Sequence, residues 1–167
     1  ESHAAGWRIA IHAIGDVTID QVLDIYEALG PHPKGWGHRI EHFGLPDAGQ
    51  LARAARLGVV AVPQSIFLYE LGRNFREYLP EALLPRCYPL RAMLDAGVTV
   101  ALSSDAPVVE NDNPLAGMTA AILRRDRSGE PLLPAQGITA AEALDAYTRG
   151  GAVAVGPQPF PDRAREH

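Results

Sequence analysis

The sequence has little cysteine, no basic cluster and no long apolar run. Cys87 is the single cysteine in 167 residues, which excludes a disulfide framework and fits a reducing, cytoplasmic setting. There are 15 Lys and Arg residues against 20 Asp and Glu residues, giving a net charge of −5. We therefore expect no nucleic-acid partner. No apolar run reaches the roughly 18 residues that a bilayer span needs, and residues 1–8 lack a signal-peptide pattern, so we expect no membrane role.

Short apolar runs alternate with helical patterns along the chain. The runs predict strands at residues 8–12, 38–42, 59–62 and 98–102. Helices with one apolar face are predicted at residues 16–29, 47–57, 90–96, 114–125 and 139–150. Asp16 is the predicted N-cap of the first helix, and Thr139 with Glu142 forms a predicted capping box. Residues 64–89 are a long connection in which aromatic and charged residues mix.

This alternation predicts an α/β fold with a parallel sheet covered by helices. One architecture is a small doubly wound sheet, and the other is part of a (β/α)₈ barrel, which needs about 250 residues and eight strands. A nucleotide-binding sheet would carry a glycine-rich loop after its first strand, but "HAIGDVT" has a single glycine. We assign residues 1–156 to one domain of parallel βα units and residues 157–167 to an irregular tail.

Three potential metal ligands follow strands of the predicted sheet. His12 and His42 end the first two strands, and Asp105 follows the fourth. The carboxyl ends of parallel strands meet at one edge, where such folds carry their chemistry. Two imidazoles and a carboxylate suit a divalent metal, most simply Zn²⁺, and a nearby carboxylate can relay protons during hydrolysis.

Each of these residues also has a structural interpretation. A lone histidine at the end of a strand is more often a satisfied polar residue than a ligand. Asp105 can instead cap the turn before Pro107. His38 begins its strand, at the wrong end of the sheet for a site, and Cys87 is expected to be a small buried apolar residue.

Five motifs, in order, resemble amidohydrolase family 3, a family of metal-dependent hydrolases, and are similar to N-substituted formamide deformylases. They are "HAIGD", "HRIEHFG", "PLRAMLDAGVTVALSSDAPV", "NPLAGMTAAILRR" and "TAAEALDAYTRGGAVAVG". Together they extend over residues 7–156. The resemblance implies a (β/α)₈ barrel and the hydrolysis of non-peptide C–N bonds at divalent metals, usually zinc. It implies that His12, His42 and Asp105 are metal ligands after strands 5, 6 and 8, and that Asp105 also shuttles protons.

The chain departs from this family at both ends, and after "AVAVG" it runs into "PQPFPDRAREH" in place of the family's glycine-rich segment. The His-x-His pair of the first barrel strand and the metal-bridging residue of the first half do not occur in it. We therefore expect strands 5 to 8 of an incomplete barrel that is inactive alone and acts on a small amide-type molecule when complete. Open sheet edges predict either a homo-oligomer or association with an N-terminal half. The alternative is a non-catalytic remnant or an association module.

Overall fold

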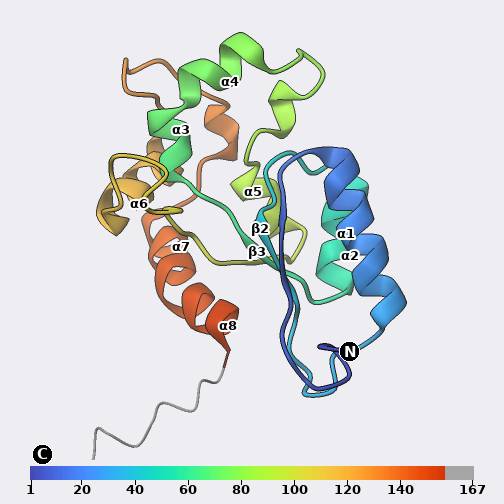
Figure 1. Ribbon diagram of the computed structural model, residues 1–167. Coiled ribbons are helices and arrows are strands. Elements are labelled where there is room, and N and C mark those ends of the chain that lie inside the picture. The colour runs from blue at the N-terminus through green and yellow to red at the C-terminus, as the bar shows by residue number, and fades with distance from the viewer. Residues whose placement is uncertain (157–167) are drawn as a thin grey trace, which may run out of the picture.

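The computed structural model describes residues 1–156 and has an α/β fold (Figure 1). Its centre is a four-stranded sheet in the order β1-β2-β3-β4, and all neighbouring strands are parallel. The strands are β1 (Ala10–Ala13), β2 (Arg39–His42), β3 (Val60–Val62) and β4 (Thr99–Val100). The predicted parallel βα units are therefore confirmed. The tail predicted at residues 157–167 lies outside the described residues.

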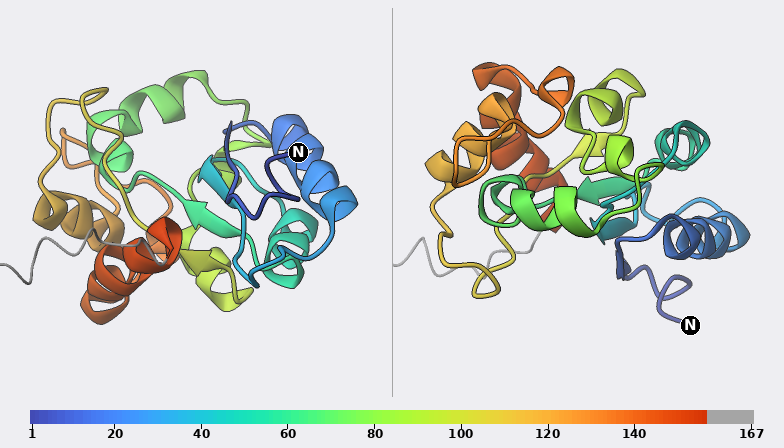
Figure 2. Two further views of the ribbon diagram at one scale, coloured as in Figure 1. Left: turned by 60° about the horizontal axis from the view of Figure 1, so that its bottom comes forward. Right: turned by 90° about the horizontal axis from the view of Figure 1, so that it is seen from above.

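Three helices cover one face of the sheet, which we call the outer face. They are α1 (Asp16–Leu29), α2 (Ala48–Arg56) and α5 (Leu90–Asp95). Alternation along the strands turns Ile40 of β2 and Ala61 of β3 toward these helices, where both are fully buried. Burying this apolar face removes it from water and is the main force that holds the βα units together. Figure 2 shows α1 and α2 together on one side of the molecule and the C-terminal helices on the other.

The C-terminal helices pass from the β4 side of the sheet to its other face, the inner face. They are α6 (Pro114–Leu123), α7 (Ala140–Asp145), a π-helical turn (Ala146–Gly150) and α8 (Gly151–Val155). On the inner face Ala154 packs with Val60, Val62 and Ala101. Arg39 Nη1 donates to the Ala154 carbonyl at 3.1 Å. Cations at these last carbonyls complement the helix dipole.

The connection from residue 64 to residue 89 is more ordered than the sequence predicts. It contains α3 (Ile66–Glu70), α4 (Gly72–Tyr78) and a 3₁₀ turn (Leu84–Arg86). Its apolar residues form a second core with Leu132 rather than with the sheet. Because these elements are short and pack against another distant loop, their apolar spacing carries little helical periodicity.

The helix starts agree with the sequence except at α1. Thr139 and Glu142 form the predicted capping box at α7. The N-cap of α1 is Gly15, in an extended conformation, so the assignment to Asp16 was wrong by one residue. Asp16 is the first helical residue, and its carboxylate accepts from the Val17 N–H at 2.8 Å. An acidic side chain in the first turn is favourable because the helix N-terminus is electropositive.

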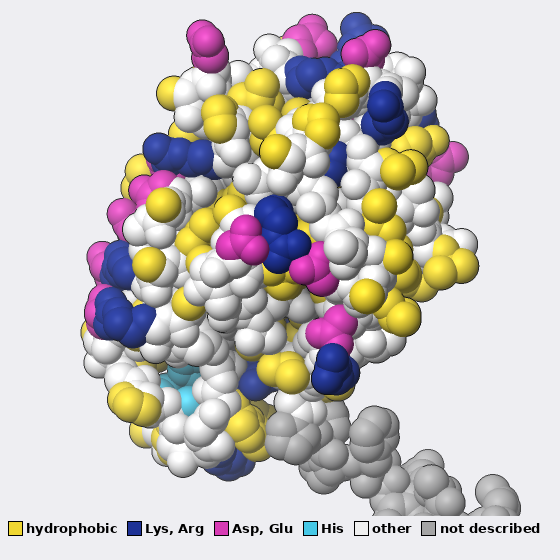
Figure 3. Space-filling view, turned by 180° about the vertical axis from the view of Figure 1, so that it is seen from behind, with side chains coloured by type: hydrophobic (Ala, Val, Ile, Leu, Met, Phe, Trp, Pro, Cys, Tyr) yellow, Lys and Arg dark blue, Asp and Glu magenta, His cyan; other side chains and the backbone are white. Residues whose placement is uncertain are grey.

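Acidic and basic side chains are interspersed over the face seen in Figure 3, with no area of a single sign. Opposite charges also pair in the structure, for example Arg91 with Glu142 at 2.7 Å. Among residues 1–156, no helix combines the length and the apolar character that a membrane crossing requires.

Candidate metal site at the carboxyl edge of the sheet

The first two predicted ligands lie on neighbouring strands. His12 is the third residue of β1 and is exposed on the inner face, opposite Glu41 of β2. His42 is the last residue of β2 and is only 6% exposed. Parallel pairing places the two strand ends side by side, because Ala13 is in register with His42.

The rings of His12 and His42 are in contact. Their centroids lie 4.4 Å apart, with the planes inclined by 73°. Regular alternation would put His42 on the outer face with Ile40, since the two residues are two positions apart. His42 instead has a φ of 70°, in the left-handed region, and the following Phe43 has a φ of 48°. This departure from extended backbone brings the ring to the inner side, against His12. Non-glycine residues held in this region carry strain that clusters at functional sites.

A buried glutamine holds the other side of the His42 ring. His42 Nδ1 lies 2.6 Å from Oε1 of Gln64, which follows β3 and is 2% exposed. The Gln64 amide nitrogen donates to the Val62 carbonyl at 2.8 Å and to Ser103 Oγ at 2.9 Å. The glutamine therefore connects the carboxyl ends of β2, β3 and the segment after β4.

Asp105 lies on the loop that follows β4. The Ser103 N–H donates to the Pro63 carbonyl at 3.0 Å, which keeps this loop beside the end of β3. Asp105 also has a left-handed backbone, with a φ of 58°. Burial, then the thiol of Cys87 and then the charge of Asp105 raise the pKa of Tyr88.

The structure joins two of the three predicted ligands. Within residues 1–156, no three His, Cys, Asp or Glu side chains are grouped closely enough to hold a metal ion. The donor set of His12 and His42 nevertheless fits one. Both are imidazoles in contact with each other, and the Nδ1 of His42 is engaged, so its Nε2 is the nitrogen left available as a ligand. The described side chains thus place two candidate ligands together, with the third candidate, Asp105, on the loop after β4.

The strand beside His12 also carries an acidic residue. Glu41 is opposite His12 in the strand register, and its Oε1 is 2.6 Å from Nε of Arg39. Because Arg39 neutralises Glu41 on the inner face, the carboxylate is engaged before any ligand arrives. Along β2, the inner face therefore carries first this ion pair and then, at the carboxyl edge, the two histidines.

Two candidates are structural, as the alternative interpretation predicted. His38 Nδ1 accepts from the Ile9 N–H at 3.1 Å, and its Nε2 is 2.9 Å from Nδ1 of His3. Burial, followed by the nearby His32, His3 and Arg8, lowers the pKa of His38 to about 4. Cys87 is fully buried, and its burial raises the pKa of the thiol to about 12, well above that of a reactive cysteine.

Gln64 and Phe67 contact His42 but were not predicted from the sequence. Phe67 is buried and stacks on His42 with a centroid separation of 6.1 Å. Gln64 could have been found, because a polar side chain directly after a buried strand lies at the same edge as His12 and His42. Phe67 had no such signal, since its contact depends on the fold of α3.

Enzymes of the barrel and doubly wound classes carry their functional groups at the carboxyl edge of a parallel sheet, and His12 and His42 lie at this edge here. The sequence profile of the amidohydrolase family matches residues 1–158, and the chain belongs to this family.

Individual relatives agree with this assignment. The chain is 37% identical over 153 residues to an N-substituted formamide deformylase of Arthrobacter pascens, covering 90% of this chain and 28% of that protein. An uncharacterized metal-dependent hydrolase of Pyrococcus horikoshii superposes with a TM-score of 0.78 at 29% identity, covering 90% of this chain and 30% of that one. Its counterpart from Pyrococcus furiosus gives a TM-score of 0.73 at 28% identity, over 91% of this chain and 30% of that one. The chain therefore spans less than a third of the length of these relatives.

Proposed function

We propose that this chain contributes part of the active site of a metal-dependent hydrolase that cleaves non-peptide C–N bonds of the amide or formamide type. The contact between His12 and His42 at the carboxyl edge of the sheet carries this proposal. Membership of the amidohydrolase family supports the reaction class. The similarity to a protein named N-substituted formamide deformylase supports the substrate class, a small molecule with an amide-type bond.

In this proposal His12 and His42 would hold a divalent metal, most simply zinc, and Asp105, which is not grouped with them in the described structure, would join them when the metal binds. Such a metal, when bound, polarises water so that it can attack a carbonyl carbon near neutral pH. Asp105 accepts a proton from the attacking water on its carboxylate and passes it to the nitrogen that leaves. Asp105 is therefore both a ligand and the catalytic acid–base residue.

The side chains around the pair suit this role. The buried ring of Phe67 stacks on His42, and Tyr88 meets Phe67 edge-on at 6.2 Å. These rings exclude water from one side of the His42 imidazole, which strengthens the electrostatic interactions made there. The other side, toward His12, stays open to a substrate because His12 is exposed.

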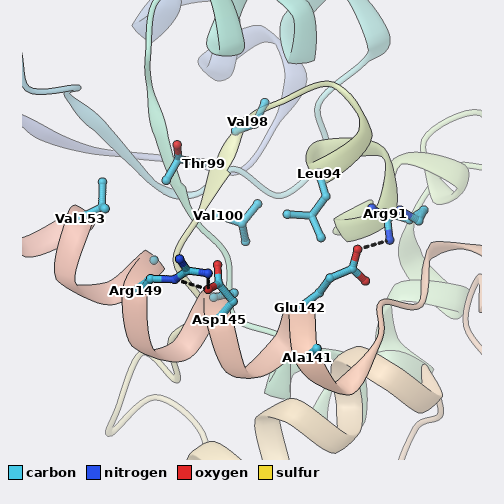
Figure 4. Close-up of a pocket in the computed structure, with 12 residues that line it drawn as sticks. Arg91, Leu94, Val98, Thr99, Val100, Ala141, Glu142, Asp145, Arg149 and Val153 are labelled. Carbon is cyan, nitrogen blue, oxygen red and sulfur yellow. Dashed lines mark hydrogen bonds and ion pairs between the residues drawn. The ribbon is translucent and has the colours of Figure 1, made fainter.

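We also propose that β1 to β4 correspond to strands 5 to 8 of the barrel and that further strands pair at the two edges of this sheet. In the described residues, β1 and β4 each pair on one side only. Figure 4 shows the space beside β4, a pocket of about 710 Å³ lined by Val98, Thr99 and Val100 of the β4 segment together with α5 and α7. Unpaired strand edges expose backbone N–H and C=O groups that can pair with another strand. A second copy of the chain or an N-terminal half of the barrel would fill this space.

The metal content of the purified protein tests the central proposal. We expect stoichiometric zinc in the wild type and its loss in the double variant His12→Ala, His42→Ala. His3→Ala is the matched control, because His3 contacts His38, which precedes β2 at the opposite end from His42. Absence of zinc after incubation with the metal, or equal zinc in all three proteins, would contradict the site.

Activity is tested on the chain assembled with a second copy or with an N-terminal half of the barrel. The substrate is an N-alkylformamide, and the release of formate is measured. We expect turnover that Asp105→Asn reduces by at least about 100-fold, since acid–base groups contribute about 10²–10⁴-fold. Wild-type turnover that Asp105→Asn leaves unchanged would refute the role of Asp105. A protein that binds zinc but hydrolyses no amide-type compound would favour the non-catalytic association module.

A further inference from the structure

We propose that Gln64 is a positioning residue that fixes His42 in the tautomer with a proton on Nδ1. This inference rests on the proposed function, because it concerns how His42 presents its second nitrogen to a metal. Gln64 itself contributes no ligand, and its amide is directed at three protein groups.

The hydrogen bonds define the orientation of the Gln64 amide. Its nitrogen lies 2.8 Å from the Val62 carbonyl oxygen, which can only accept. The amide nitrogen must therefore be on that side, so the amide oxygen is the atom 2.6 Å from His42 Nδ1. Because the amide oxygen can only accept, Nδ1 carries the proton. The Val62 carbonyl thus determines, through Gln64, which nitrogen of His42 is protonated.

Burial makes this constraint strong. Gln64 is 2% exposed and His42 is 6% exposed, so bulk water does not compete for the bond between them. If the His42 tautomer reversed, Nδ1 and the glutamine oxygen would be two buried acceptors facing each other without a proton. Leaving buried polar groups unpaired costs free energy, so the arrangement selects one tautomer.

The consequence is chemical. A neutral imidazole with its proton on Nδ1 offers the lone pair of Nε2 as a ligand. Groups that hydrogen-bond the far nitrogen of a metal-binding histidine typically change metal affinity by about 10–100-fold when they are mutated. The Gln64 amide nitrogen also donates to Ser103 Oγ at 2.9 Å, so a second hydrogen bond holds the amide in place.

The tautomer can be measured without any metal, from the ¹⁵N chemical shifts and long-range couplings of the His42 ring. We expect the wild type to show the Nδ1–H form. Gln64→Met removes the acceptor at similar volume and is expected to populate the Nε2–H form. Gln64→Glu keeps an acceptor and should keep the Nδ1–H form. Ser103→Ala is the matched control and should also keep it, because Val62 still holds the amide.

Zinc titration by calorimetry supplies the second measurement. We expect Gln64→Met to weaken zinc binding by about 10–100-fold and Ser103→Ala to change it by much less. An unchanged Nδ1–H form in Gln64→Met would overturn the inference, as would an Nε2–H form in the wild type. If the tautomer responds but the wild type binds no zinc, the proposed metal site is refuted while the control of the tautomer by Gln64 stands.

Discussion

The imidazole rings of His12 and His42 meet edge to face, with 4.4 Å between their centroids, although the residues belong to opposite faces of a regular parallel sheet. The left-handed backbone at His42, with a φ of 70°, removes it from the alternation that Ile40 follows. Two side chains from neighbouring strands thereby converge above the inner face, and a metal shared by two strands requires this convergence.

Two adjacent glycines give a matched test of the packing of the C-terminal helices on β4. A Cβ on Gly150 would lie 2.2 Å from the Val100 carbonyl oxygen, whereas a Cβ on Gly151 would meet nothing within 4 Å. We expect Gly150→Ala to destabilise the protein by about 1–3 kcal/mol through overpacking. Gly151→Ala should stabilise it by up to about 1 kcal/mol through helix propensity. Urea denaturation measures both, and equal effects would contradict the close approach to Val100.

Arg124 is a buried cation that binds carbonyl groups instead of a carboxylate. Its guanidinium donates to the carbonyls of Leu132 at 3.0 Å, Tyr88 at 2.8 Å and Cys87 at 3.0 Å. Arg124→Met leaves the carbonyls of Leu132 and Cys87 without a donor, whereas the Tyr88 carbonyl still accepts from the Leu90 N–H at 2.8 Å. The variant is expected to cost at least about 2 kcal/mol, at about 1–3 kcal/mol for each unsatisfied group. The exposed neighbour Arg125 is the control, and Arg125→Met should cost less than about 1 kcal/mol in the same thermal or urea melts.

The stability of the N-terminal segment should depend on the protonation of His38. Its pKa falls from 6.5 to about 4 in the folded protein, chiefly through burial. The unfolded chain therefore binds a proton more readily between these values, so this contribution to stability is complete above pH 6.5 and is lost as the pH falls through about 4. The Ile9 N–H donates to His38 Nδ1. We therefore expect the Ile9 amide to lose protection from hydrogen exchange as the pH falls over this range. Protection that is independent of pH would contradict the assignment.

Stability is expected to depend on pH a second time, at lower pH, through Glu142 at the start of α7. The N–H of Thr139, then Arg91, lower the pKa of Glu142 from 4.5 to about 2. The ionised form is therefore favoured by folding, and its contribution is present above pH 4.5 and lost as the pH falls through about 2. Glu142→Gln should flatten the acid limb of a stability–pH curve. Glu77→Gln, which changes an exposed carboxylate 3.7 Å from Arg73, should leave that limb unchanged.

Much of the fold could be read from the sequence, because its signals are local. The alternation of apolar runs with capped helices located all four strands, and the Thr139–Glu142 box located α7. The family was confirmed by the match over residues 1–158. The segments that stayed unassigned, α3 and α4, are short helices whose apolar residues pack with Leu132, more than 50 residues away in the chain. Such long-range packing leaves no local period to detect.

Part of the candidate site could likewise be predicted from the sequence, and part could not. The sequence predicted His12 and His42 at the carboxyl ends of parallel strands and Asp105 after the fourth strand, and their service as metal ligands stays a prediction. Only the tertiary structure decided that His42 leaves the outer face, because a backbone dihedral in the left-handed region cannot be inferred from "HRIEHFG" by alternation. Only it placed Gln64 against the ring, because a hydrogen bond across 22 residues forms once β2 and β3 are paired. Residue type thus set what chemistry is available, and the pairing of strands set which atoms meet.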